Sequence, residues 1–315
     1  MNIIVCVKQT PEAGKGEMHP AKGTVLRSGS RQVINPFDLY AMEAALRLQE
    51  ELPDTRIIAL SMGPASAASV LRDCIGLGAE NGYLVCDPAF AGSDVRGTAQ
   101  VLARAVRVIE EREGIGADAV FCGAKTVDGG TSMLGPELAQ FLGIPQVTYA
   151  LYCSLQSGQD LQGQQDSKGE KDSKGERNPK GTDAEAVDRA VRNKICLRVE
   201  KEDDRGNRIY NLPLPGLVTF TKASFQVRYP MIARILQAES MELPVLSAED
   251  LKTIDPSRAG FFSKKPLAAG LEAAAMQVQK VQLRKLDKQS QIIEDPDPVK
   301  AVTALAQRLF SEGIL

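Results

Sequence analysis

Aromatic residues and histidine are scarce in this chain of 315 residues: aromatics make up 5%, tryptophan is absent, and His19 is the single histidine. The shortage of aromatics argues against a surface on which nucleic-acid bases stack. A formal net charge of -2 gives no basic field to attract nucleic acid. One histidine in a polar stretch argues against a zinc site and against a Ser-His-Asp or Cys-His catalytic set.

Long apolar runs are absent as well. No stretch approaches the roughly 18 apolar residues of a membrane span, and the first residues, MNIIVCVK, do not resemble a signal peptide. The six cysteines form no C-x-x-C pair, and most stand in apolar runs. We therefore expect buried, reduced thiols, no iron–sulfur cluster, and a cytoplasmic protein without a membrane span.

Strand-like and helix-like segments alternate through the first half of the chain. The apolar, β-branched runs predict strands at 3–7, 56–62, 82–86 and 117–122. Helices are predicted from Pro36 with Asn35 as N-cap, from about residue 65, and over 98–113 and 133–142. This order predicts an α/β fold, a Rossmann-like parallel sheet with helices on both faces, which binds ligands at the carboxyl ends of its strands.

The most informative stretch runs from Phe121 to Pro136 and reads FCGAKTVDGGTSMLGP. A strand that opens through glycines into a helix is a common phosphate cradle, because free N–H groups and the helix dipole both favour an anion there. In this glycine loop (residues 123–132), Gly129 and Gly130 can adopt backbone angles that other residues resist. Thr131 and Ser132 either cap the helix or donate hydroxyl groups to a phosphate. The local pattern alone fits a phosphate site and an ordinary capped turn equally well.

The second half of the chain is less regular. Residues 156–190 are rich in Gly, Ser, Gln, Lys and Glu and contain the repeat DSKGEKDSKGER. Such a segment buries too little apolar surface to become ordered, so we expect a mobile hairpin extension. Strands are predicted at 194–200, 217–222 and 277–285, a short helix at 231–238, and an amphipathic helix at 299–310. The last helix is expected either to pack on a partner protein or to pack back onto its own domain.

Several ordered blocks together resemble the beta (small) subunit of electron transfer flavoproteins. VCVKQ at 5–9 resembles the family's first strand, INPFDLYAMEAAL at 34–46 its asparagine-proline helix start, and MGP at 62–64 with VLRDCIGLGAE at 70–80 its next strand–helix unit. The stretch from Gly123 to Pro136, followed by LGIPQVTY at 142–149, is similar to the family signature, and DPDP at 295–298 also fits. The resemblance covers nearly the whole chain except the insertion at 156–190.

The resemblance implies an adenine-nucleotide-binding domain (adenine nucleotide alpha hydrolase-like) at residues 1–235. It also implies a C-terminal arm at 236–315 that packs on a larger alpha subunit, which carries its own FAD. In this family the beta subunit holds either AMP or, in electron-bifurcating relatives, a second FAD. The block AGSDVRGT at 91–98 looks similar to the one that contacts the isoalloxazine ring, although Val95 replaces a threonine. We therefore favour FAD over AMP, with NADH or a dehydrogenase as electron donor.

The family's nucleotide-binding positions carry over to this chain residue by residue. They are Cys6, Val7, Lys8, Asn35, Pro36, Phe37, Asp38, Met62, Arg72, Asp94, Thr98, Gly123, Ala124, Lys125, Thr126, Val127, Asp128, Gly129, Gly130, Thr131, Ser132, Met133 and Leu134. Lys8 and Arg72 are expected either as cations near the cofactor or as solvated surface bases. No acid–base catalyst and no metal ligand are expected.

The chain departs from the family in two places. Gly130 and Met133 replace an acidic residue and a glutamine, which removes polar contacts to the nucleotide. The docking segment (residues 228–238) resembles the loop that meets dehydrogenase partners, but Arg234 is its only base after Tyr229, where the family has several lysines. Two rival interpretations are a nucleotide-binding regulator of universal-stress type, which would be much shorter, and a nucleotide hydrolase, for which the G-x-x-x-x-G-K-[ST] loop is missing.

Overall fold

The computed structural model describes residues 1–12, 17–18, 25–26, 31–157, 195–203, 206–222, 225–252, 269–270, 274 and 292–314. The chain divides into two compact units, Met1–Val278 and Gln279–Leu315. In the second unit, helix α8 (Pro298–Ser311) begins at Asp297, whose carboxylate accepts a hydrogen bond from the N–H of Val299 at 3.0 Å. This confirms the predicted C-terminal helix.

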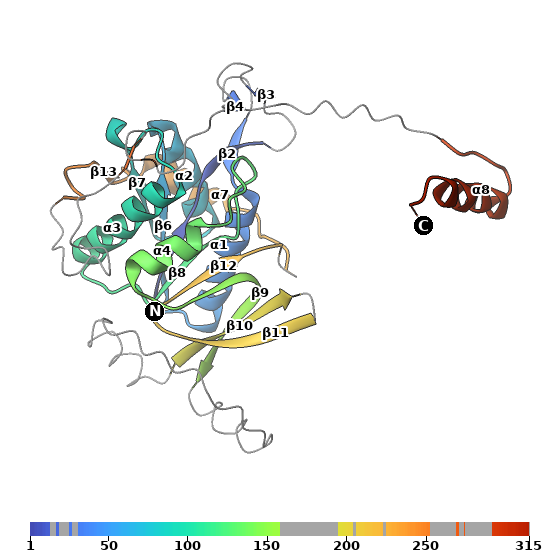
Figure 1. Ribbon diagram of the computed structural model, residues 1–315. Helices are drawn as coiled ribbons and strands as arrows, with labels where there is room; N and C mark the ends of the chain where they lie inside the picture. Colours follow the sequence, from blue (N-terminus) through green and yellow to red (C-terminus); the bar gives the residue numbers. More distant parts are fainter. Residues whose placement is uncertain are drawn as a thin grey trace. The chain divides into compact units, whose positions relative to one another are not determined.

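A nine-stranded sheet forms the centre of the first unit, in the order β11-β10-β9-β12-β8-β1-β6-β7-β13 (Figure 1). The seven strands from β9 to β13 in this order are parallel, whereas β9, β10 and β11 pair antiparallel. Their bounds are β1 Asn2–Cys6, β6 Arg56–Met62, β7 Asn81–Val85, β8 Ala119–Gly123, β9 Gln146–Ser157, β10 Ile195–Asp203, β11 Gly206–Pro213, β12 Gly216–Phe220 and β13 Val245–Leu246. Two short pairs lie outside it: β2 (Gln9–Pro11) with β5 (Gln32–Ile34), and β3 (Glu17–Met18) with β4 (Val25–Leu26).

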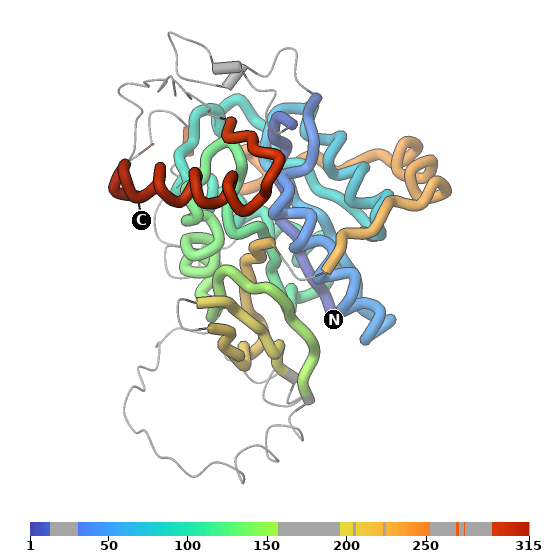
Figure 2. Tube along the Cα trace, turned by 90° about the vertical axis from the view of Figure 1, so that its right-hand side faces the viewer, coloured from blue at the N-terminus to red at the C-terminus, as the bar shows by residue number. Residues whose placement is uncertain are grey.

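Helices cover both faces of the sheet, as predicted. Strand residues alternate between the faces, so Ile3 and Val5 pack with α1 and α2, whereas Ile4 and Cys6 pack with α3 and α4. The helices are α1 Pro36–Glu51, η1 Ala65–Ala67, α2 Ala68–Leu77, η2 Pro88–Phe90, α3 Val95–Glu113, α4 Leu134–Leu142 and α7 Ile232–Ser240. Helix α7, orange in Figure 2, lies beside α2.

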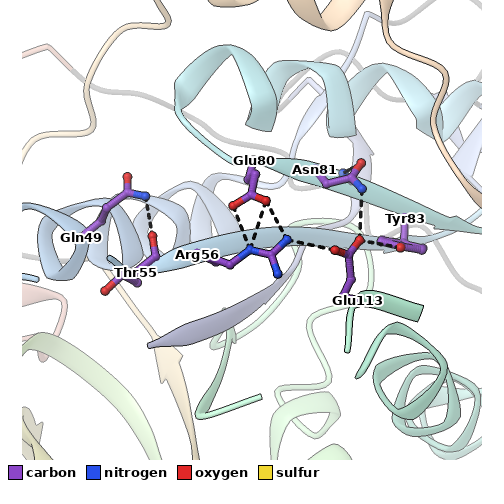
Figure 3. Close-up of polar contacts among 8 residues, drawn as sticks. Gln49, Thr55, Arg56, Glu80, Asn81, Tyr83 and Glu113 are labelled. Carbon is purple, nitrogen blue, oxygen red and sulfur yellow. Dashed lines mark hydrogen bonds and ion pairs between the residues drawn. The ribbon is translucent and has the colours of Figure 1, made fainter. Parts of the chain in front are cut away.

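A cluster of charged residues joins the elements at the amino ends of the central strands. The guanidinium of Arg56, at the start of β6, donates to Glu80 at 2.6 Å and to Glu113 at 2.9 Å (Figure 3). Glu113, the last residue of α3, also accepts from the Tyr83 hydroxyl at 2.7 Å and from the Asn81 amide at 3.3 Å. Arg56 and Glu113 are therefore bound to other side chains of the protein. These charged hydrogen bonds stabilise the amino edge of the sheet.

The predicted strands and helices of the first half correspond closely to β1, α1, β6, α2, β7, α3, β8 and α4. Helix α3 begins three residues earlier than predicted, at Val95, because Asp94 caps it. Strand β11, which we did not predict, carries mostly exposed residues and so lacks an apolar signal. Residues 158–190 of the predicted hairpin extension and the predicted strand at 277–285 lie outside the described residues.

The close contact between α4 and β12 gives a stability prediction. A Cβ on Gly135 would lie 2.2 Å from Cγ2 of Thr219 and 3.2 Å from Sγ of Cys122. Gly135→Ala should therefore lower the free energy of unfolding by about 1–3 kcal/mol through overpacking. Thr219→Ser removes the obstructing methyl group and keeps the hydroxyl that accepts from the N–H of Tyr149 at 3.0 Å.

Urea unfolding of both single variants and of the double variant tests this explanation. If the clash is the cause, Gly135→Ala/Thr219→Ser should recover most of the lost stability. Simple addition of the two single effects would contradict it, because residues in contact should show an interaction energy.

Candidate functional site

The predicted site residues lie at the carboxyl edge of the parallel sheet, at its switch point. Strand β1 stands between β6 and β8, so the chain crosses to one side after β1 and reaches the other side only with β8. Cys6 pairs with Leu60 on one side and with Cys122 on the other. This register brings the exits of β1, β6 and β8 together, at the place where open α/β sheets bind ligands.

The carboxylate of Asp38 joins three chain segments at this edge. It accepts hydrogen bonds from the N–H of Lys8 at 2.7 Å, the N–H of Gly123 at 3.0 Å and the side-chain amide of Asn35 at 2.9 Å. A Cβ on Gly123 would lie 2.3 Å from the Asp38 carboxylate, so only glycine fits where β8 meets α1. Asp38 is 4% exposed, and this burial raises the pKa of its carboxyl to about 7, although the three donors oppose the rise.

The side chain of Asn35 holds the first half of the glycine loop. Its amide group donates to the carbonyl of Lys125 at 2.9 Å, and its oxygen accepts from the N–H of Val127 at 3.2 Å. Asn35 is fully buried, and its own N–H donates to the carbonyl of Lys8 at 2.9 Å. Asn35 does precede α1 as predicted, but its side chain makes no capping hydrogen bond. Its polar atoms bind the loop instead.

Lys8 and Asp128 form an ion pair across the loop. The ammonium nitrogen of Lys8 lies 2.8 Å and 2.9 Å from the two carboxylate oxygens of Asp128. Although burial alone would raise the pKa of Asp128, the hydrogen bond and charge of Lys8 hold it below its ordinary value. The positive charge that we expected near the cofactor is therefore balanced by a carboxylate of the same loop.

In the second half of the loop and at the start of α4, several backbone donors have no partner among the described residues. Gly130 (φ 62°) and Ser132 (φ 58°) have left-handed backbones, and α4 begins at Leu134 without a side-chain cap. Thr131 and Ser132 thus do not cap the helix. The N–H groups of residues 131–135 donate no hydrogen bond to any residue that the structure describes. Such a row of free donors at a helix start can bind an anion.

The remaining predicted residues have different surroundings. Burial raises the pKa of the Cys6 thiol to about 12, so it stays protonated at neutral pH. Asp94 accepts from the N–H of Gly97 at 2.8 Å as the N-cap of α3, and Thr98 is half-buried in the first turn. Helix α3 packs against α4, and burial together with the charge of Asp94 raises the pKa of Glu137 in the first turn of α4. Arg72 is half-buried on α2, and among the described residues no hydrogen bond or ion pair joins it to the loop.

A buried carboxylate on α1 anchors the docking segment. Glu43, 2% exposed, accepts from the guanidinium of Arg228 at 2.8 Å and 3.0 Å and from the Arg228 N–H at 3.2 Å. Burial alone would raise the pKa of Glu43, but the hydrogen bonds and charge of Arg228 hold it below its ordinary value. Beyond this anchor, five large apolar side chains are exposed: Tyr229 (87%), Met231 (60%), Ile232 (77%), Ile235 (38%) and Leu236 (62%). The sequence did not reveal Glu43, because its partner is distant along the chain.

Neither a candidate metal cluster nor a membrane-spanning helix is found in the described part of the chain. There, no three His, Cys, Asp or Glu side chains come close enough together to hold a metal ion. Similarly, none of the helices placed in the structure has the length and apolar character that crossing a bilayer requires.

Comparison with known proteins gives one family model and many relatives. The model described as "Electron transfer flavoprotein domain" matches residues 22–169. The electron transfer flavoprotein subunit beta of Megasphaera elsdenii is 34% identical over 249 residues, 79% of this chain and 78% of the relative. Protein FixA of Azorhizobium caulinodans is 32% identical over 89% of this chain and 87% of its own. The caffeyl-CoA reductase-Etf complex subunit CarD of Acetobacterium woodii is 30% identical over 88% and 86%, respectively.

The raised pKa of Asp38 predicts how stability varies with pH. In the folded protein this carboxyl keeps its proton up to about pH 7, whereas an unfolded chain releases it near about pH 3.9. Its contribution to stability is therefore fully present below about pH 4 and is lost as the pH rises to about 7, by up to about 1.4 kcal/mol per pH unit. Asp38→Asn, which cannot titrate, should gain stability relative to the wild type over this range.

Urea unfolding of both proteins at about pH 5, 6, 7 and 8 measures the effect. The difference in unfolding free energy should move in favour of the variant up to about pH 7 and then level off. A difference that does not vary with pH would mean that Asp38 is already ionised at pH 5.

Proposed function

Because the chain belongs to the electron transfer flavoprotein beta subunit family, we propose that it binds an adenine nucleotide at the carboxyl edge of its sheet. We further propose that it forms a heterodimer with an alpha subunit and takes part there in electron transfer. The observation that carries the proposal is the row of N–H groups at residues 131–135, which find no acceptor among the described residues. Phosphate oxygens are acceptors of the right charge for a helix start. The six cysteines are free thiols, which supports a cytoplasmic location.

The residues of the site suit a bound nucleotide that is held rather than chemically attacked. The N–H groups of 131–135 would bind its phosphate, while Asn35 and Asp38 hold the loop that presents them. The Cys6 thiol stays protonated and so offers no thiolate nucleophile, and the charge of Lys8 is balanced by Asp128. When bound, a flavin would supply the redox chemistry of the site. The chain itself contributes binding, orientation and exclusion of water.

We prefer FAD to AMP as the nucleotide of this subunit, with NADH or a dehydrogenase as electron donor. The support is the position of Asp94 and Thr98 at the start of α3, which faces the start of α4. A ligand longer than AMP could extend from the phosphate cradle towards this block. AMP remains the second candidate, because the cradle at residues 131–135 suits the phosphate of either nucleotide.

Cofactor content separates these two candidates. The chain should be co-expressed with its neighbouring alpha subunit, and flavin and adenine nucleotide should be counted per heterodimer after release. We expect two FAD and no AMP. One FAD with one AMP would identify a subunit that holds a structural nucleotide. A heterodimer with no nucleotide in the beta subunit, or no heterodimer at all, would contradict the proposed function.

The docking segment is proposed as the contact surface for a dehydrogenase partner. The segment is held on α1 by the ion pair of Arg228 with Glu43, and on α2 by the N–H of Met231, which donates to the carbonyl of Gly76 at 3.1 Å. The relative CarD is named as a subunit of a complex with a caffeyl-CoA reductase, which supports a flavin-dependent enzyme as partner here. A preformed apolar surface binds such a partner with little loss of conformational freedom.

Ile232→Asp tests this surface. Ile232 is 77% exposed, so the charge should leave the fold intact but oppose burial against a partner. We expect the KM for the dehydrogenase partner to rise about tenfold or more, while reduction by an artificial donor is unchanged. Ile209→Asp is the matched control, because Ile209 is 53% exposed on β11, outside the docking segment. Equal effects of the two substitutions would argue against the docking segment.

A further inference from the structure

The side chain of Asn35 has no polar atom left for a ligand. Its amide nitrogen donates to Asp38 and to the carbonyl of Lys125, and its oxygen accepts from the N–H of Val127. An amide nitrogen has two protons to donate, so both donors are used within the protein. Asn35 is also fully buried. The family resemblance makes Asn35 a nucleotide-binding position, but both protons of its amide already donate within the protein and the side chain is buried.

These bonds fix one half of the glycine loop and leave the other half open. Lys125 and Val127 are held by Asn35, and Asp128 is held by Lys8. Asp38 in turn fixes Asn35 and the exit of β8 at Gly123. Beyond Gly130, whose N–H donates to the carbonyl of Thr126 at 3.0 Å, the donors of 131–135 have no partner among the described residues. The fixed half therefore determines where the open half can present its N–H groups.

We propose that Asn35, oriented by Asp38, is a positioning residue that holds the glycine loop in the shape that binds phosphate, and that it does not contact the nucleotide through its side chain. This inference rests on the proposed nucleotide-binding function. It gives the side chains and the backbone of the site different roles. Buried side chains set the geometry, and backbone N–H groups make the contact. Loss of Asn35 should then weaken the binding of the phosphate and spare the binding of the nucleoside.

AMP and adenosine are the probes that separate these two contributions. The alpha–beta heterodimer, freed of exchangeable nucleotide, is titrated with each by isothermal titration calorimetry. For Asn35→Ala we expect at least a tenfold weaker affinity for AMP and less than a twofold change for adenosine. A purely structural defect would weaken both alike, so the ratio of the two dissociation constants is the decisive quantity.

Asn81→Ala is the matched control at the opposite edge of the sheet. The side chain of Asn81 also uses both polar ends within the protein, donating to Glu113 at 3.3 Å and accepting from the N–H of Gly82 at 2.8 Å (Figure 3). This variant should change neither affinity. If Asn35→Ala does not assemble, Asn35→Asp keeps the acceptor for Val127, removes the donors, and should again weaken AMP more than adenosine.

Three results would overturn the inference. Unchanged affinity for AMP in Asn35→Ala would show that the loop does not depend on Asn35. Equal weakening of AMP and adenosine would show a general defect or a direct contact with the nucleoside. A wild-type heterodimer that binds neither probe would refute the proposed nucleotide binding itself, and the inference with it. Only the first two results would leave the proposed function standing.

Discussion

The buried carboxylate of Asp38 is the interaction on which the carboxyl edge depends. A parallel sheet aligns the exits of β1 and β8, but it does not fix the loops that follow them. Asp38 does so, by accepting from the N–H groups of Lys8 and Gly123 and from the side chain of Asn35. Because these donors come from separate parts of the chain, the first turn of α1 becomes the frame on which the glycine loop is built.

The two edges of the sheet use polar groups in different ways. At the amino edge, Arg56 and Glu113 find partners in neighbouring elements, so this cluster stabilises the junction of β6, β7 and α3. At the carboxyl edge Asn35, Asp38 and Asp128 are paired as well, but the N–H groups of residues 131–135 find no acceptor among the described residues. The proposed binding site therefore lies where buried side chains are paired with one another and main-chain donors lack acceptors in the described part of the chain.

Much of the fold could be predicted because its signals are local. Apolar β-branched runs defined β1 and β6, and Asn35 with Pro36 defined the start of α1. Strand β11 was missed because its side chains are mostly exposed and carry no alternation. The glycine loop was identified from its sequence, but the roles within it were not. The pairing of Lys8 with Asp128, and of Glu43 with Arg228, joins residues far apart in the chain, and a single sequence contains no local pattern for such contacts.

Helix α1 carries both Asp38 and Glu43, and thus bears the glycine loop at its first turn and the docking segment one turn and a half later. Within the docking segment, only the anchor Arg228 has to pair with Glu43 on this helix. The exposed side chains beyond Arg228 are not linked by Glu43 to the glycine loop. The outer surface can therefore diverge between lineages while the inner edge stays the same. Surface substitutions beyond Arg228 can therefore change what the docking segment binds without altering the glycine loop.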